Sequence, residues 1–565
     1  MKIIFIYLVC IFFDGYSCYI FQVHTSQGSV YGNFYRNDIG ESYNFFLGIP
    51  YAQAPTGNKR FMSPESPKHF GYHDGSQNDP KMCVQARTTT SPAEGNEDCL
   101  YLSIYTPSVP TSERHEILKN PKYPVMVWFH DGRFDKGSGN YGGVRPDYLV
   151  NKGVVVVNVN YRLGVFGFLS FGNKELPGNM GLKDQIAALK WITAEISKFG
   201  GDVDKITVFG SGSGAASIHY LLLCKECKGL FHRVILQSGS AYNPWAMQYQ
   251  REKRVNDLFK LLKLNEFKSN KTDIYINLLQ QDKNDMYKSA AVFKAAREIM
   301  SNDDKNRALP IFLPVIEPSD SRDAVITKDL KHKDFLKEKS GVQVMIGFNS
   351  KEGINLATEH YKTVSVSDEL LKTVIPRKDN IDKKTEEEII KLLKEQYFKT
   401  TDNQKILEEF ANLVGDAQYI YGIYNTAKDL LGNGFKTYFY RLSYNKYSTY
   451  KQSDEYKASS QYKSFSGVAH GDEQAYFFRP KDGYLGSISN HLPDDETKRV
   501  QNNILNLWTN FAKSGSPTLN GVTWNPLSTA TINYLDIGSS LKMKNMEEQD
   551  RMNTWDTISK KLEGT

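Results

Sequence analysis

A glycine-rich turn is the segment of this sequence most able to carry chemistry. The apolar strand predicted at Ile206–Phe209 leads straight into Gly210–Gly214, which reads GSGSG and opens a helix. The pattern G-x-S-x-G at such a turn holds a serine on a strained backbone at the edge of a sheet, ready for nucleophilic attack. Here the central position is Gly212, and serines stand only on its two sides, at Ser211 and Ser213.

The elements that must position this turn can be predicted from runs of apolar residues. Five such runs indicate strands covered on both faces, and hence a largely parallel sheet. They are Val125–His130, Val154–Tyr161, Ile206–Phe209, Arg233–Gln237 and Val342–Phe348. Apolar residues at helical spacing follow in Gly181–Ile192 and again from Val500 to Phe511. We therefore expect one large α/β domain, a mostly parallel twisted sheet with helices on both faces, over residues 19–565.

The composition and the first residues of the chain limit the classes of protein to which it can belong. The 565 residues include 24% charged and 13% aromatic side chains, enough to bury a large core. The net charge of +6 is spread along the chain, which argues against nucleic acid as a partner. Ile3–Phe13 is an apolar run too short to span a bilayer, and small residues follow it. This pattern predicts a signal peptide over residues 1–18 and a secreted, extracellular protein without a membrane anchor.

Four cysteines remain beyond the predicted leader. Cys83 paired with Cys99 would close a short loop, which is worth roughly 3 kcal/mol by the chain-entropy estimate. Cys224 and Cys227 form a CxxC, for which a local disulfide, free thiols or a redox or zinc centre all stay open. We predict no cofactor and no metal. Asn270 begins the sequon Asn-Lys-Thr and is a candidate glycosylation site.

Longer motifs distributed along the chain identify a family. They are FFLGIPYAQAPTGNKRF (45–61), EDCLYLSIYTP (97–107), NYRLGVFGFLS (160–170), GNMGLKDQIAALKWI (178–192), FGGD (199–202) and WTNFAKSGSPT (508–518). With these the sequence resembles the carboxylesterase and cholinesterase family, most of all the secreted insect-type carboxylesterases, over nearly the whole mature chain. The resemblance implies an α/β-hydrolase fold and a disulfide between Cys83 and Cys99.

The resemblance also assigns the catalytic positions. The family's elbow reads Gly-Glu-Ser-Ala-Gly, which puts Gly212 at the nucleophile position, so that the catalytic serine is lost. IGFNSKEG resembles the acid motif and puts Glu352 at the acid position, while GVAHGDEQAYFF resembles the histidine motif and puts His470 at the base position. Without a nucleophile, we expect Glu352 and His470 to persist as a buried pair that stabilises loops.

The oxyanion loop departs from the family as well. The family's His-Gly-Gly-Gly-Phe appears here as His130–Phe134, which reads HDGRF. The backbone donors of an oxyanion hole would then fall on Gly132, Arg133 and Ser213. Arg133 adds a long side chain where glycine lets a carbonyl approach, and Asp131 adds a negative charge where an oxyanion would form. Both changes oppose acyl transfer.

These departures predict a pseudoenzyme of the carboxylesterase family. It would act by binding a small lipophilic ester-like ligand or a protein partner, as the family's non-catalytic adhesion members do, although Arg133 would partly fill the pocket. The alternative is a functional serine-type carboxylic-ester hydrolase. It would need Ser211 or Ser213 as a substitute nucleophile, or water activated by His470.

Overall fold

The computed structural model describes most of the chain after the predicted leader. The described ranges are residues 21–36, 41–77, 79–86, 91–110, 122–140, 143–248, 250–261, 311–330, 341–360, 366–376, 381–448, 465–479, 494–528 and 532–563. The predicted signal peptide and the sequon at Asn270 lie outside them. Among these ranges, no helix has the length and apolar character needed to cross a membrane.

Thirteen strands of the described residues join in one sheet of order β1-β2-β3-β5-β7-β6-β8-β9-β10-β11-β12-β13, with β4 paired to β2. The strands are β1 (Phe21–Thr25), β2 (Gly28–Arg36), β3 (Ser42–Pro50), β4 (Gly71–Asp74), β5 (Tyr101–Thr106), β6 (Tyr123–Phe129), β7 (Val155–Val159), β8 (Gly201–Ser211), β9 (Arg233–Gln237), β10 (Gln343–Asn349), β11 (Thr437–Leu442), β12 (Asn533–Ile537) and β13 (Leu541–Asn545). The centre of the sheet, from β7 to β12, is parallel throughout.

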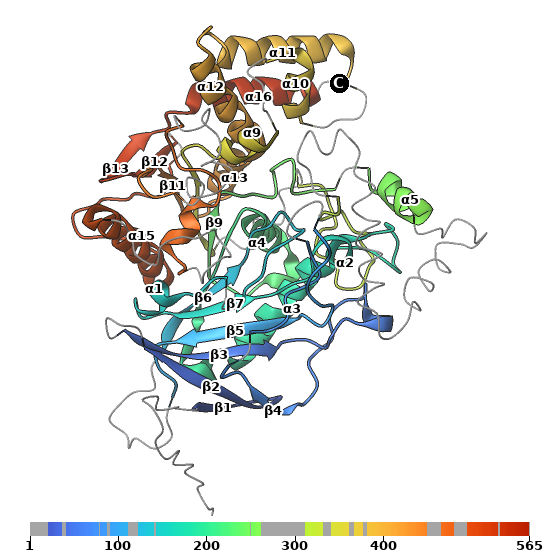
Figure 1. The fold of residues 1–565 in the computed structure, drawn as a ribbon, viewed down its shortest axis with the longest axis vertical. Coiled ribbons are helices and arrows are strands. Elements are labelled where there is room, and N and C mark those ends of the chain that lie inside the picture. Colours follow the sequence, from blue (N-terminus) through green and yellow to red (C-terminus); the bar gives the residue numbers. More distant parts are fainter. Residues whose placement is uncertain are drawn as a thin grey trace, which may run out of the picture.

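Helices lie on both sides of this sheet and form a separate group beside its β11–β13 end (Figure 1). They are α1 (Asp147–Val150), α2 (Gly164–Phe168), α3 (Met180–Glu195), α4 (Ser213–Leu223), α5 (Arg251–Leu261), α9 (Ile354–His360), α10 (Asp368–Val374), α11 (Lys383–Tyr397), α12 (Asn403–Gly415), α13 (Tyr421–Gly432), α15 (Asp495–Ser514) and α16 (Gln549–Glu563). A π-helical turn, Asp416–Ile420, joins α12 to α13 without a break. Short 3₁₀ turns occur at Gly57–Lys59, Ile196–Phe199, Lys225–Cys227 and Asp472–Tyr476.

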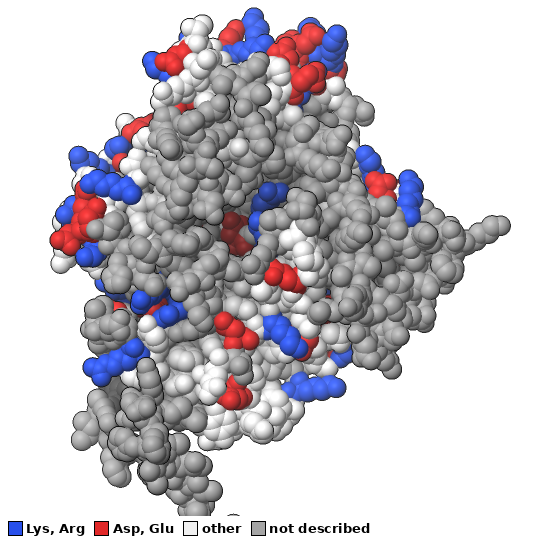
Figure 2. Space-filling view, viewed as in Figure 1, with Lys and Arg blue, Asp and Glu red and all other residues white. Residues whose placement is uncertain are grey.

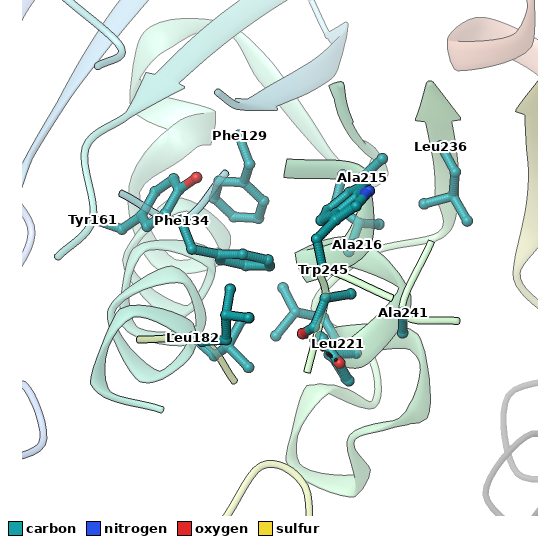
Figure 3. Close-up of a cluster of buried hydrophobic side chains, with 14 of the residues drawn as sticks. Phe129, Phe134, Tyr161, Leu182, Ala215, Ala216, Leu221, Leu236, Ala241 and Trp245 are labelled. Atoms are coloured by element: carbon teal, nitrogen blue, oxygen red, sulfur yellow. Dashed lines mark hydrogen bonds between the residues drawn. The ribbon is translucent and has the colours of Figure 1, made fainter. Parts of the chain in front are cut away.

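Each central strand divides its side chains between two apolar layers. In β6, Val125, Val127 and Phe129 pack toward α3 and α4, whereas Met126 and Trp128 pack toward α15. Successive side chains of a strand point to opposite faces, so an uninterrupted apolar run is what a sheet covered on both faces requires. Figure 3 shows the layer beneath α3 and α4, where Phe134 lies among Phe129, Leu182 and Trp245.

The predicted fold class, a mostly parallel sheet with helices on both faces, is confirmed, and antiparallel strands extend the sheet at its two edges. The five predicted strands all form, as β6 to β10, and Gly181–Ile192 lies within α3. The sheet is mixed, because β1, β2, β3 and β5 pair antiparallel, as do β12 and β13. Strands β1, β2 and β13 are partly exposed, so their sequences lack the continuous apolar runs that reveal the central strands.

Two features fasten the loops near the predicted site. Arg162 donates from Nε and Nη2 to the carboxylate of Asp184 on α3, at 2.8 and 2.7 Å, and both side chains are buried. Cys83 and Cys99 form a disulfide, as the resemblance implied. Cys224 and Cys227, in contrast, are buried and not joined to each other. Among the described residues on the face shown in Figure 2, charges of both signs are interspersed, with no basic stripe.

Candidate active site

The candidate site lies at the carboxyl ends of three parallel strands of the sheet, β6, β8 and β10. Gly212 forms the turn between β8 and α4, Asp131 follows β6, and Glu352 follows β10. His470 belongs to the loop before the Asp472–Tyr476 turn, and the side-chain amide of Asn349, the last residue of β10, donates to the neighbouring Ala469 carbonyl at 2.8 Å. The carboxyl ends of parallel strands meet at one edge of a sheet, where such folds place their ligands.

His470 lies between two carboxylates. Its Nδ1 is 2.8 Å from Oε2 of Glu352, and its Nε2 is 3.2 Å from Oδ2 of Asp131. Glu352 is held in turn by the backbone amide of Asn349, which donates to Oε1 at 2.6 Å. Since both ring nitrogens face acceptors, both carry hydrogen, and the ring is an imidazolium.

The Asp131 carboxylate occupies the predicted oxyanion hole. Its Oδ1 accepts hydrogen bonds from the backbone amide of Ser213 at 2.9 Å and from that of Arg133 at 3.5 Å. The backbone amide of Gly132 donates to the same carboxylate. Ser213 is also the first residue of α4, so the anion lies at the positive end of a helix dipole. The three backbone donors expected from the sequence therefore converge on a side chain of the chain itself.

Among the described residues, the hydroxyls of the two serines beside Gly212 are bonded to carboxylates and not to His470. The Ser211 hydroxyl is buried and donates to Oε1 of Glu473. The Ser213 hydroxyl donates to Oδ1 of Asp131 at 3.1 Å. In both, the hydroxyl proton is committed to a carboxylate.

The backbone of the 131–134 loop explains why Asp131 reaches the hole. Gly132 has φ 135°, and a Cβ atom there would lie 1.7 Å from the Lys136 carbonyl oxygen, so only glycine fits. Arg133 and Phe134 follow with φ of 60° and 63°, in the left-handed region that non-glycine residues rarely adopt. Phe134 compensates by burying its whole side chain, with its ring edge-on to Phe168 at 5.1 Å.

Charge and burial shift the pKa values of His470 and Asp131 in opposite directions. Burial alone would lower the pKa of His470, but its interactions with Tyr419, Asp131 and Glu352 raise that pKa well above 6.5. Burial would raise the pKa of Asp131, yet the hydrogen bonds from His470, Ser213 and Gly132 hold it below 3.8. An ionised Asp131–His470 pair is the result. Glu473 differs, because burial raises its pKa to about 7.

Sequence reasoning missed three neighbours of His470. Tyr419 stacks on the imidazole, with ring centroids 4.3 Å apart, and comes from the π-helical turn after α12. The side-chain amide of Asn349 donates to Oε2 of Glu473 at 2.6 Å, and Oε1 of Glu473 accepts a hydrogen bond from the Ser211 hydroxyl. Glu473 was visible within the histidine motif, three residues after His470, but nothing in the sequence marks Tyr419.

The π-helical turn is itself anchored from the end of the described chain. Asp416, its first residue, accepts from Nε of Arg551 on α16 and from the hydroxyl of Tyr397 on α11, each at 2.6 Å. Trp555 donates to the Tyr397 hydroxyl at 2.8 Å. Asp416 is fully buried, and burial raises its pKa although Arg551 opposes the shift.

The sheet with its parallel centre, the turn between β8 and α4 and the acid–histidine pair together define an α/β-hydrolase fold. The carboxylesterase family model matches residues 21–555, and the chain belongs to that family. It is 31% identical to juvenile hormone esterase of Tribolium castaneum, covering 90% of this chain and 86% of the relative. It is also 31% identical to neuroligin-3 of Mus musculus, covering 84% of this chain but only 58% of that protein. Venom carboxylesterase-6 of Apis mellifera is 39% identical over 43% of this chain and 42% of its own length.

Substitution of serine for Gly212 alone is expected to lower the melting temperature. Gly212 has φ 50°, and a Cβ atom there would lie 2.2 Å from Oδ1 of Asp131. The serine would be strained by about 1–3 kcal/mol, and it would displace a carboxylate from its donors. Differential scanning calorimetry of Gly212→Ser should show a larger fall than Gly57→Ser, since Gly57 has φ 57° but nothing within 4 Å of its Cβ direction. Equal falls would mean that Asp131 does not oppose a side chain at this position.

The Asp131–His470 pair should make stability depend on pH. His470 has a raised pKa, so its contribution is complete below about pH 6.5 and is lost as pH rises through the folded value. Asp131 has a lowered pKa, so its contribution is complete above about pH 3.8 and is lost as pH falls through the folded value. The difference in unfolding free energy between wild type and Asp131→Asn should be largest between these limits and shrink at alkaline pH.

Urea denaturation at a series of pH values measures this difference. Glu473 titrates in both proteins, so its effect cancels in the comparison. Asp495→Asn, at a carboxylate with a fully exposed side chain, is the matched control and should give a flat profile. A wild-type minus Asp131→Asn difference that stays constant into alkaline pH would contradict the assignment of an ionised pair.

Proposed function

We propose that this protein has lost carboxylic-ester hydrolysis and acts as a secreted binding protein, with a lipophilic ester-like ligand or a protein partner. The observation that carries the proposal is the Asp131 carboxylate among the amides of Gly132, Arg133 and Ser213. An ester carbonyl activated by these amides would have to replace an anion already bonded to them and to His470. Removal of one donor of this kind costs about 10² to 10³ in turnover, and here all of them are engaged.

The missing nucleophile supports the same proposal. Gly212 stands at the elbow position of the family, and neither neighbouring serine contacts His470. Nε2 of His470, the atom that would activate serine or water, faces Asp131 instead. The similarity to other proteins leaves activity open, because this chain is comparably identical to a protein named as an esterase and to neuroligin-3. The site geometry is therefore the stronger argument.

Secretion is proposed on two grounds. The apolar run at residues 3–13 has the length and flanks of a signal peptide. The similarity to a carboxylesterase named from venom agrees with an extracellular protein. Mass determination of the mature N-terminus after expression in insect cells tests this part; a mature chain beginning near residue 19 is expected, and an intact Met1 terminus would overturn it.

Ester hydrolysis is tested with p-nitrophenyl acetate and p-nitrophenyl butyrate. The purified protein should release nitrophenol at the rate of the buffer blank, and His470→Ala should not change that rate. A fluorophosphonate probe, which labels activated serines, should leave the chain unlabelled. Labelling, or turnover that His470→Ala abolishes, would overturn the proposal and turn attention to Ser211 and Ser213.

The binding arm of the proposal is tested by thermal shift. A long-chain ketone of the shape of a fatty-acid ester cannot be hydrolysed, so it reports binding alone. A melting temperature that rises with ketone concentration supports the ligand. No rise at any soluble concentration would exclude this ligand class and leave a protein partner.

A further inference from the structure

Asp131 occupies the place of a nucleophile as well as that of an oxyanion. We propose that Asp131 attacks epoxides and that this site hydrolyses them to diols. The inference goes beyond the proposed function: ester hydrolysis stays lost, and the same site carries out a different reaction on a lipophilic ligand. Carboxylates are established covalent nucleophiles in enzymes. In a serine triad the nucleophile faces a histidine that an acid holds in place. The chain supplies this arrangement as Asp131, His470 and Glu352.

The two oxygens of Asp131 are held differently, which fits two different roles. Oδ1 accepts hydrogen bonds from the backbone amides of the predicted oxyanion hole, at 2.9 Å from Ser213 and 3.5 Å from Arg133. Oδ2 faces Nε2 of His470 at 3.2 Å. Oδ2 is thus the oxygen free to attack a carbon, while Oδ1 stays in place. The side chains of Asp131 and His470 keep 18% and 13% of their surface exposed, so a small electrophile can reach them.

The protonated histidine selects an epoxide over other electrophiles of saturated carbon. Opening an epoxide produces an alkoxide, which needs a proton, and the Nε2–H of His470 adjoins the attacking oxygen. Transfer of that proton leaves a neutral imidazole, which can serve as a base in the next step. An alkyl halide would leave as halide without taking the proton. His470 would then remain protonated and unable to activate water.

The first step balances as follows. Oδ2 of Asp131 forms a bond to one epoxide carbon, and the bond from that carbon to the ring oxygen breaks. The ring oxygen takes the electron pair of the broken bond and the proton from Nε2 of His470. An ester of Asp131 that carries a neighbouring hydroxyl is formed, and the strain of the three-membered ring is released.

In the second step the backbone amides stabilise the oxyanion of a tetrahedral intermediate. Neutral His470 takes a proton from water, and the hydroxide attacks Cγ of Asp131. The negative charge develops on Oδ1, which already lies among the amides of Ser213, Arg133 and Gly132. Collapse breaks the bond between Cγ and the ester oxygen, and the departing alkoxide takes the proton of the new carboxylic acid. The diol leaves, and Asp131 and the imidazolium are restored.

Tyr419 and Glu352 would hold the histidine in place through this cycle. The Tyr419 ring lies parallel to the imidazole within 28°, at 4.3 Å. Glu352 is fully buried and keeps its bond to Nδ1 whether His470 is charged or neutral. Both are positioning residues, because neither contacts the reacting carbon.

The experiment uses the full secreted chain and styrene oxide, with phenylethanediol measured by chromatography. The expected rate is at least about 10²-fold above the buffer blank, the lower range for a positioned acid–base group. Asp131→Asn should return the rate to the blank, and Asp495→Asn, remote from the site, should retain it. His470→Gln should also return the rate to the blank, because it removes both the proton donor of the first step and the base of the second.

Isotope placement tests the mechanism without any variant. In a single turnover in H₂¹⁸O, the label should enter the Asp131 carboxylate, and the first diol should carry none of it. Label in the first diol would show direct attack by water and overturn the nucleophile assignment. A wild-type rate equal to the blank would overturn the inference as well. Ester hydrolysis by the same preparation would instead contradict the proposed function, so the two failures are distinguishable.

Discussion

Asp131→Gly combined with Gly212→Ser should hydrolyse p-nitrophenyl acetate at least about 10³-fold faster than wild type. Loss of the nucleophile costs roughly 10⁶ in a model protease, and the double substitution returns both the nucleophile and an empty set of backbone donors. The acid and base need no change, because His470 is already bonded to Glu352 at 2.8 Å. Without Asp131, Nε2 of His470 is free to accept the proton of the new serine.

Gly212→Ser alone should stay at background, since its Cβ would lie 2.2 Å from Oδ1 of Asp131. The added change Arg133→Gly should raise activity further, because Arg133 has φ 60°, where glycine is not strained. His470→Ala in the double variant should return hydrolysis to background. Stopped absorbance assays at matched protein concentration measure all four proteins. Activity of Gly212→Ser equal to that of the double variant would show that Asp131 does not block the site.

Asp184→Ala should lower the free energy of unfolding by about 3–5 kcal/mol, the usual cost of breaking a buried ion pair from one side. Arg162 keeps 3% of its side chain exposed and Asp184 none. Besides its hydrogen bonds to the Arg162 side chain, Asp184 accepts one from the Arg162 backbone amide at 3.1 Å. Removal of the carboxylate leaves a buried guanidinium without its counter-ion. The damage should exceed that of most single core substitutions.

Urea denaturation followed by tryptophan fluorescence measures this loss. Asp184→Asn keeps the volume and one acceptor, so it provides a measurable variant where the alanine form is not secreted. Asp320→Ala is the matched control, since its pair with Lys174 leaves both side chains about 63–64% exposed. The control should lose little stability, because an exposed ion pair is screened by solvent. Similar losses at Asp184 and Asp320 would mean that the buried pair does not hold α3 to the loop before it.

The central strands were predictable because burial on both faces leaves an unbroken apolar run. β9 was placed to the residue, at Arg233–Gln237. The edge strands β1, β2 and β4 were not, because one solvated face gives them a weak signal. Of the site, the sequence motifs singled out Glu352, His470 and the amides near Asp131. The orientation of Asp131 was beyond sequence reasoning, because it depends on two consecutive non-glycine residues with positive φ, at 133 and 134.

Because α16 anchors the π-helical turn, this helix also helps to hold His470 in position. Arg551 on this helix neutralises buried Asp416, three residues before the tyrosine that stacks on the imidazole. A protease that removes α16, or a stop codon before residue 551, would leave the buried Asp416 carboxylate without its counter-ion. Tyr419 would then be held less firmly against the His470 ring. Damage to α16 would therefore reach Tyr419 and His470, because α16 packs directly against the π-helical turn.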